Sequence, residues 1–316
     1  MRLSKREYSP QCGTPIKKVT LREEFMKDKA LYFMVIPYFA LFVFMIVLPI
    51  LASLALSFTY FNGFEPAQFS GLSNYISMFL DDDVFFIALR NTLAMALITG
   101  PLSYFFCFIL AWFINDFSSG VRVFLTFIFY APSLSSAVFF VWVFLFSGDA
   151  YGFINGSLMN IGIINEPIQW LTDPKYNFTI LMIVQVWMSL GTGFLAFIAG
   201  FHSIDCSLYE AGSIDGVRNR FQELIYITLP MMKPQLVFGA VMQISASFAV
   251  STVSMALCGF PSPNYSAHTI VLHIMDFAMI RYDMGYACAV SVFLFVLTLL
   301  VKRGVDLVMR YINDEA

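Results

Sequence analysis

The stretch ALYFMVIPYFALFVFMIVLPILASLALSFTYFNGF, residues 30–64, contains no charged side chain. A helix rises about 1.5 Å per residue, so roughly 20 apolar residues cross the ~30 Å hydrocarbon layer of a membrane. The stretch is long enough for that, and it is longer than the ~7–15-residue apolar core of a signal peptide. We therefore predict an uncleaved first transmembrane span.

The rest of the chain is similarly apolar. Hydrophobic residues make up 59% of the 316 positions and charged residues only 12%, with 36 Phe, more than a soluble core of this length would bury. We predict an all-α, polytopic inner-membrane protein with a cytoplasmic tail (1–29) and a six-helix transmembrane domain (30–316). In the tail, Thr20 and Glu23 match a capping box and predict a juxtamembrane helix. The six transmembrane helices are expected at 31–58, 86–114, 123–146, 178–201, 235–257 and 286–309.

The positions of Lys and Arg predict the orientation. If the N-terminus is cytoplasmic, all but three of the 18 Lys and Arg residues lie on the cytoplasmic side, the exceptions being Arg90, Lys175 and Arg281. Cationic loops resist translocation, so both termini are expected in the cytoplasm. The outer acidic run Asp81–Asp83 has two interpretations: solvated residues that suit the start of a helix, or a docking patch for an external partner.

The sequence contains no motif for catalysis or metal binding. A phosphate-binding loop, an H-E-x-x-H zinc motif and a G-x-S-x-G nucleophile motif are all absent. The five cysteines have neither disulfide-framework nor metal-site spacing. We expect no catalytic residue, no metal ligand and no enzymatic activity in this chain.

A polar segment, 207–229, separates the fourth and fifth predicted spans. Ser207 and Glu210 match a capping box, which predicts a helix from Leu208, and Asp215-Gly216 predicts a turn. Asn219 and Gln222 predict the start of a second helix that ends before Pro230. The prediction is a cytoplasmic helix-turn-helix whose apolar side chains need a covering partner.

Six segments resemble the permease subunits of binding-protein-dependent ATP-binding-cassette importers, most closely the carbohydrate, maltose-type class. The segment at 208–216 resembles the EAA coupling motif of that family. The segments follow the family's order over nearly the whole chain: GLSNYISMF (71–79), RNTL (90–93), IQWLTDP (168–174), LYEAGSIDG (208–216), ITLP (227–230) and MGYACAVSVFLF (284–295).

The resemblance implies that the polar hairpin docks on a cytoplasmic ATPase subunit, with Glu210 pairing with an Arg there. The competing interpretation is that Glu210 caps its own helix through Ser207. The chain itself would hold no cofactor, because ATP and Mg²⁺ would be bound by the partner ATPase subunits. The residues expected at the ATPase contact are Leu208, Tyr209, Glu210, Ala211, Gly212, Asp215 and Gly216.

The resemblance also implies the partners. They are a second homologous permease subunit, a dimer of ATPase subunits, an extracellular or periplasmic solute-binding protein, a sugar or oligosaccharide substrate, and membrane lipid. No nucleic-acid partner is expected, because acidic residues such as Glu7 and Glu23 interrupt the N-terminal basic cluster.

Polar residues at membrane depth predict a substrate path. They recur at helical spacing in the fourth and fifth spans, and sugars present hydroxyl groups and C–H faces that amides, hydroxyls and aromatic rings can bind. The alternative is that they only bond their own carbonyls or join helices. The candidates are Gln185, Trp187, Ser189 and Thr192 in the fourth span, and Gln243, Ser247 and Ser251 in the fifth.

Two other functions compete with the importer. An ion-coupled secondary transporter should hold an acid or base at membrane depth, and the predicted spans contain almost none. A membrane scaffold subunit would need no polar faces in the fourth and fifth spans.

Overall fold

The structure is a computed structural model that describes residues 29–135 and 138–314, so the juxtamembrane helix predicted from Thr20 and Glu23 lies outside the described residues. The chain forms two compact units, 1–53 and 54–316. The first unit contains α2 (Lys29–Phe42), the π-helical turn η1 (Val43–Val47) and the start of α3 (Leu48–Leu56). The helix Phe33–Leu56 has a mean hydropathy of 2.8, as expected for the first span.

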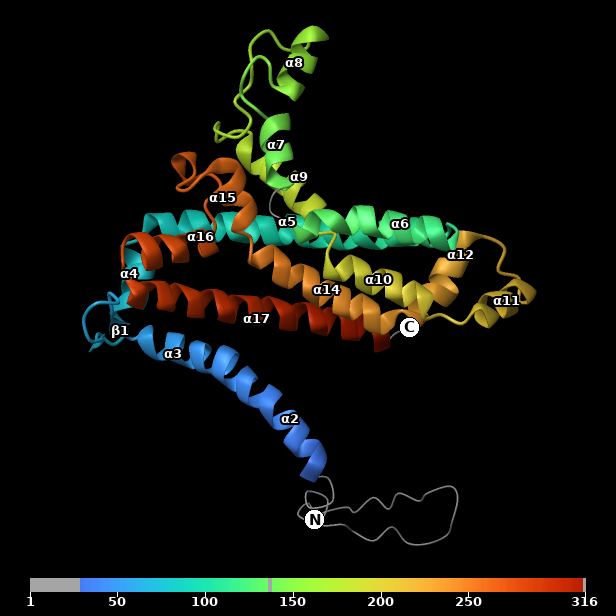
Figure 1. Cartoon of the computed structure of the whole chain (residues 1–316), viewed down its shortest axis with the longest axis horizontal. Helices are drawn as coiled ribbons and strands as arrows, with labels where there is room; N and C mark the ends of the chain where they lie inside the picture. The colour runs from blue at the N-terminus through green and yellow to red at the C-terminus, as the bar shows by residue number, and fades with distance from the viewer. Residues whose placement is uncertain (1–28, 136–137, 315–316) are drawn as a thin grey trace. The chain divides into compact units, whose positions relative to one another are not determined.

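The second unit is organised around three long helices: α5 (Asp83–Asn115), α14 (Lys233–Phe248) and α17 (Met284–Asp314). They run lengthwise beside α10 (Thr192–His202) in Figure 1. Aromatic rings fill the contact between α5 and α10, where Phe108 meets Phe197 edge to face with centroids 5.6 Å apart. This packing buries Phe194 and Phe197 completely.

Three of the predicted spans are interrupted rather than continuous. α6 (Ser119–Tyr130) and η2 (Ala131–Leu134) meet α7 (Phe139–Leu145) at an angle of 85°. α9 (Asn177–Met188) is separated from α10 by a short break. α14 is likewise followed by a break before α15 (Thr252–Cys258).

The prediction of six continuous spans is therefore only partly matched. Within the described residues, four helices are long and apolar enough to cross a membrane: Phe33–Leu56, Asp83–Asn115, Met284–Val305 and, counted across the short α9–α10 break, Asn177–Ser203. Two bent helix pairs would raise the number to six, and one of them joins Arg220–Met231 to Lys233–Phe248 instead of forming the predicted 235–257 span. Broken helices are tolerated at membrane depth where protein or a cavity satisfies the freed backbone groups.

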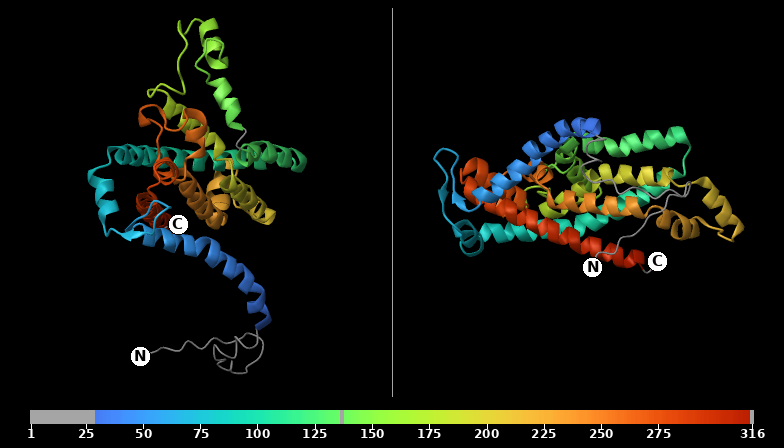
Figure 2. Two further views of the ribbon diagram at one scale, coloured as in Figure 1. Left: turned by 60° about the vertical axis from the view of Figure 1, so that its left-hand side comes forward. Right: turned by 90° about the horizontal axis from the view of Figure 1, so that it is seen from below.

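Shorter elements connect the long helices. β1 (Thr59–Tyr60) and β2 (Gln68–Phe69) pair antiparallel, with Thr59 opposite Phe69. The short helix predicted in the outer segment is present as α4 (Ser73–Leu80). α7 and α8 (Phe153–Asn160) stand away from the lengthwise helices in Figure 1 and in the left view of Figure 2. The other connecting elements are α11 (Cys206–Ile214), α12 (Arg220–Glu223), η4 (Leu224–Thr228), α13 (Leu229–Met231), η5 (Pro263–Tyr265), α16 (Ile270–Met275) and η6 (Asp276–Ile280).

Asp82 joins three elements at one end of the unit. Its carboxylate caps α5 by accepting from the Phe85 N–H at 2.9 Å, and it accepts from His273 Nε2 at 3.0 Å and from the Tyr286 hydroxyl at 2.7 Å. Burial raises the pKa of Asp82, but these hydrogen bonds outweigh it and hold the pKa below its ordinary value of 3.8. The interpretation of the acidic run as the start of a helix is confirmed, since Asp82 caps α5, but Asp82 is partly buried and bonded rather than fully solvated, while Asp81 and Asp83 are exposed.

We expect Asp82→Ala to destabilise the protein by about 2–4 kcal/mol, because it removes a helix cap and leaves the buried donors His273 and Tyr286 without an acceptor. Asp81→Ala is the matched control, since the Asp81 side chain is exposed. Thermal unfolding in detergent measures the difference. Because the folded-state pKa of Asp82 is depressed, its contribution is present above pH ~4 and is lost as the pH falls further. Equal unfolding temperatures for the two variants at pH 7 would contradict this.

Candidate functional site

The polar hairpin begins at Asp205 rather than at Ser207. The Asp205 carboxylate accepts from the Ser207 N–H at 3.0 Å, and α11 starts at Cys206. This hydrogen bond lowers the pKa of Asp205. The predicted capping box is wrong because an aspartate in extended backbone geometry precedes the serine and takes the capping position. Glu210 is therefore not a capping residue, and its exposed carboxylate accepts no hydrogen bond within the described residues.

The turn predicted at Asp215-Gly216 is present. Gly216 has φ +98°, a left-handed conformation that glycine adopts without strain. The Val217 N–H donates to the Gly212 carbonyl at 2.9 Å, and the Asp215 N–H donates to the Ala211 carbonyl at 3.0 Å. The Val217–Gly212 bond is the six-to-one hydrogen bond of a Schellman motif. The backbone of the turn is therefore fixed by its own hydrogen bonds.

The second arm of the hairpin begins as predicted but ends later. Asn219 Oδ1 accepts from the Gln222 N–H at 2.8 Å, which confirms the predicted cap. The helix does not end before Pro230, because the π-helical turn η4 shifts the bonding pattern and the Leu229 N–H reaches the Leu224 carbonyl. Pro230 then lies in the first turn of α13, where its missing N–H costs little. The chain bends by 81° only at Met232, before α14.

Side-chain contacts hold the two arms together and to the bundle. The Tyr209 hydroxyl is 3.0 Å from Thr228 Oγ1, and a Cβ on Gly212 would lie 2.6 Å from Ile227 Cδ1. Arg220 forms an ion pair with Asp116, which caps the end of α5. Several apolar side chains remain exposed on the hairpin: Leu208 (37%), Ile214 (85%), Phe221 (62%), Ile225 (43%) and Tyr226 (69%).

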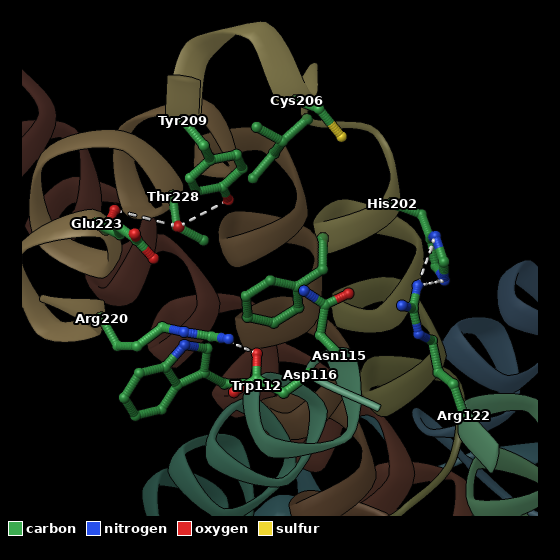
Figure 3. A pocket seen from close by; sticks show the side chains of 12 residues that line it. Trp112, Asn115, Asp116, Arg122, His202, Cys206, Tyr209, Arg220, Glu223 and Thr228 are labelled. Atoms are coloured by element: carbon green, nitrogen blue, oxygen red, sulfur yellow. Dashed lines mark hydrogen bonds and ion pairs between the residues drawn. The ribbon is translucent and has the colours of Figure 1, made fainter. Parts of the chain in front are cut away.

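A polar cavity of about 370 Å³ lies at the base of the hairpin, between the ends of α5, α6, α10 and α12 (Figure 3). One wall carries the Arg220–Asp116 pair and another carries Arg122, whose guanidinium lies 3.0 Å from His202 Nε2. Sequence reasoning missed these four residues, because each pair joins segments far apart in the chain and no local motif marks them.

The polar face predicted on the fifth span is mostly bonded inside the protein. Gln243 is buried, and its amide donates to the Ser189 carbonyl at 3.2 Å and to Cys107 Sγ at 3.3 Å. Ser247 is also buried, and its hydroxyl donates to the Ile244 carbonyl at 2.8 Å. In this conformation Gln243 joins α14 to α5 and to the α9–α10 break, whereas the Ser247 hydroxyl is bonded within α14.

Gln185 and Ser251 instead both line a second cavity of about 300 Å³. Its other lining residues include Ser133 and Thr252, so the α6–α7 and α14–α15 interruptions and the end of α9 surround it. Trp187 packs edge to face on Trp142, and neither Trp187 nor Thr192 lines this cavity. Sequence reasoning missed Ser133, although the polar run beside Pro132 within an apolar span is a signal that could have indicated it.

Broken apolar helices around a cavity that carries several polar side chains, joined to a polar hairpin at one end, are typical of a multi-pass membrane transport protein. The family model for the inner membrane component of binding-protein-dependent transport systems matches residues 116–313, and the chain belongs to this family. The chain is 33% identical over 264 residues to the probable ABC transporter permease protein YesP of Bacillus subtilis, covering 82% of this chain and 84% of that one.

Two further similarities agree with this assignment. The lactose transport system permease protein LacF of Rhizobium radiobacter is 34% identical over 206 residues, 65% of this chain and 67% of the relative. A chain of a bacterial ABC transporter that imports the acidic polysaccharide alginate has the same fold, with a TM-score of 0.76 at 24% identity over 92% of this chain and 99% of that one. The predicted importer family is confirmed, which excludes the secondary transporter and the scaffold, and the chain is a transport subunit and not an enzyme.

We expect Gly216→Ala to loosen the hairpin, because a left-handed conformation costs a residue with a Cβ about 1–2 kcal/mol. Hydrogen exchange of the amides at 206–217 should accelerate by roughly 5–30-fold. Gly304→Ala is the matched control, since Gly304 lies in α17 with open space around its Cβ position. Unchanged exchange in Gly216→Ala would show that the turn does not require glycine.

Proposed function

We propose that this subunit forms half of the pathway for a sugar or oligosaccharide and is driven through its hairpin by ATPase subunits that bind ATP and Mg²⁺. A second, homologous permease subunit would complete the pathway, and an external solute-binding protein would deliver the substrate. The observation that carries the proposal is the fixed hairpin with an unengaged carboxylate at Glu210 and an exposed apolar surface. The Lys and Arg distribution supports a cytoplasmic position for the hairpin and both termini.

Glu210 is suited to bind a cation on the ATPase. It is exposed, it is not needed to cap α11, and apolar side chains such as Leu208 and Ile214 lie exposed on the same helix. A carboxylate–guanidinium pair next to an apolar contact adds direction to the docking. The motif residues Ala211 and Asp215 close the end of the same helix through their backbone, and Gly212 and Gly216 allow the close contact and the turn.

The geometry of the hairpin supports transmission of movement as a rigid body. The first arm follows α10, which begins next to the α9–α10 break, and the second arm bends into α14, which ends at the α14–α15 break. A displacement of the hairpin by the ATPases would therefore act along both helices toward the interrupted region that surrounds the 300 Å³ cavity.

We expect Glu210→Gln to lower the ATP hydrolysis stimulated by the binding protein by about tenfold, which corresponds to the loss of one charge-assisted bond of ~1.4 kcal/mol. The measurement uses the reconstituted transporter, with assembly confirmed by gel filtration. Ser207→Ala is the control, because α11 is capped by Asp205 and the change should leave activity near wild type. Equal ATP hydrolysis by Glu210→Gln and wild type would refute the coupling role. An equal loss of ATP hydrolysis in Glu210→Gln and Ser207→Ala would instead indicate that the two residues act together as a capping box.

Carbohydrate is the substrate class that the relatives favour. Their names include lactose, sulfoquinovosyl glycerol and arabinooligosaccharides, and the solved structures with this fold import alginate. The 300 Å³ cavity offers the Gln185 amide and the hydroxyl-bearing residues Ser133, Ser251 and Thr252, groups that can exchange hydrogen bonds with sugar hydroxyls.

We expect Gln185→Ala and Ser251→Ala each to raise the substrate concentration for half-maximal transport by about 5–10-fold, the effect of one lost hydrogen bond of ~1–1.4 kcal/mol. Ser245→Ala is the matched control, because Ser245 lies on α14 outside the cavity and its hydroxyl bonds the Val241 carbonyl. Transport is measured in proteoliposomes at saturating binding protein. If all three variants behave alike, the cavity is not the substrate path.

A further inference from the structure

A narrow groove between α6 and α10 carries charge at one end only. It has a volume of about 260 Å³, with Val123 and Phe127 of α6 and Leu195 and Ile198 of α10 on its apolar walls. The Thr126 hydroxyl donates to the Arg122 carbonyl of its own helix at 2.8 Å, so it offers the groove no free donor. The polar end consists of Arg122 and His202, which also line the polar cavity at the base of the hairpin.

Arg122 has a charge that the described residues do not neutralise. Its guanidinium donates to the Phe117 carbonyl at 3.1 Å and lies 3.0 Å from His202 Nε2, but no carboxylate of the described chain lies within ion-pair distance. Its Nε is buried and has no hydrogen-bond partner. The nearest carboxylates in the neighbouring cavity are Asp116, which is paired with Arg220, and Glu223.

We propose that this groove binds an anionic phospholipid, with the headgroup phosphate at Arg122 and His202 and an acyl chain between α6 and α10. An unneutralised guanidinium with exposed terminal nitrogens at the end of an apolar groove suits an oxyanion, and a guanidinium binds phosphate in a directed way. The groove extends along α6 from Arg122 to Tyr130, about 12 Å at 1.5 Å per residue, against ~15 Å for one leaflet of hydrocarbon.

The combination of the two ends favours a lipid over other occupants. A free phosphate compound would leave the walls formed by Val123 (67% exposed) and Phe127 (64% exposed) uncovered. A covering protein helix would have to bring its own acidic side chain to Arg122. An anionic phospholipid supplies the oxyanion and the apolar chain in one molecule, and Arg122 lies in the first turn of an apolar helix, where headgroups meet hydrocarbon.

A lipid bound here would connect α6 to α10 directly above the hairpin. His202 ends α10, and Asp205, the cap of α11, follows three residues later. The site would therefore stabilise the relative position of the two helices at the point where the hairpin begins. This role is independent of whether Glu210 contacts an ATPase.

The test measures retention of dioleoyl phosphatidylglycerol by native mass spectrometry of the intact transporter, with its partner subunits, in mild detergent and without nucleotide. Arg122→Gln removes the charge, and Val123→Trp fills the groove at an exposed position while leaving the charge. Arg303→Gln and Phe124→Trp are the matched controls, since neither residue lines the groove and both are exposed. Each groove variant should need about tenfold more lipid than wild type for equal retention, and the controls should behave as wild type.

The source of the anion is tested in the same experiment. Phosphatidylcholine should be retained weakly and equally by all variants, and soluble glycerol phosphate should not displace phosphatidylglycerol. The proposal is overturned if wild type and both groove variants retain phosphatidylglycerol equally, as they would if another subunit covered the groove. It is also overturned if glycerol phosphate competes fully, which would indicate a site for a soluble anion. Gel filtration confirms that each variant assembles.

Discussion

The hydrogen bond from the Gln243 amide to the Ser189 carbonyl fixes the centre of the second unit. An interrupted helix leaves backbone groups without intrahelical partners, and in an apolar bundle each of these must be satisfied by the protein. The Ser189 carbonyl lies at the α9–α10 break and accepts from Gln243 Nε2 of α14 at 3.2 Å. The same amide contacts Cys107 Sγ of α5, so one side chain joins three helices at the point where one of them is broken.

The other breaks are satisfied in the same way. The Val250 carbonyl, in the α14–α15 break, accepts from the Thr269 hydroxyl at 2.7 Å, and the Tyr130 carbonyl at the end of α6 accepts from the Ser133 hydroxyl at 2.8 Å. These bonds make interrupted helices possible without exposing their backbone to lipid. They also place hydroxyl and amide groups around the 300 Å³ cavity, which continuous apolar helices could not provide.

The elements that could be predicted from the sequence are those specified by residues close together in the chain. Long charge-free runs located α5 and α17, and Asn219 with Gln222 located the second arm of the hairpin. The breaks were not predicted, because the short polar runs that mark them interrupt long apolar stretches and two of the groups that satisfy them, Thr269 for Val250 and Gln243 for Ser189, come from distant segments. The same limit applies to the sites: Gly216 was found from its turn, whereas the burial of Gln243 and the Arg122–His202 contact depend on packing between helices.

The helix α5 is held at both ends, and this gives the second unit a fixed element. Its 33 residues span about 50 Å at 1.5 Å per residue. At one end Asp82 accepts hydrogen bonds from His273 and Tyr286, and at the other Asp116 pairs with Arg220 of the hairpin. The first end is mostly buried and stays ionised at neutral pH, whereas the ion pair at the second end is exposed, with 61% and 39% of the two side chains accessible.

Exposed ion pairs contribute little to stability and exchange partners at small cost, while a mostly buried and fully bonded carboxylate is costly to disrupt. If the ATPases displace the hairpin as proposed, the end of α5 near the hairpin is thus the one that would release its contact. The end near α16 and α17 resists displacement. Movement of the hairpin would then shift α10 and α14 against a stationary α5, and the Gln243 contacts between these helices are where that shift has to be accommodated.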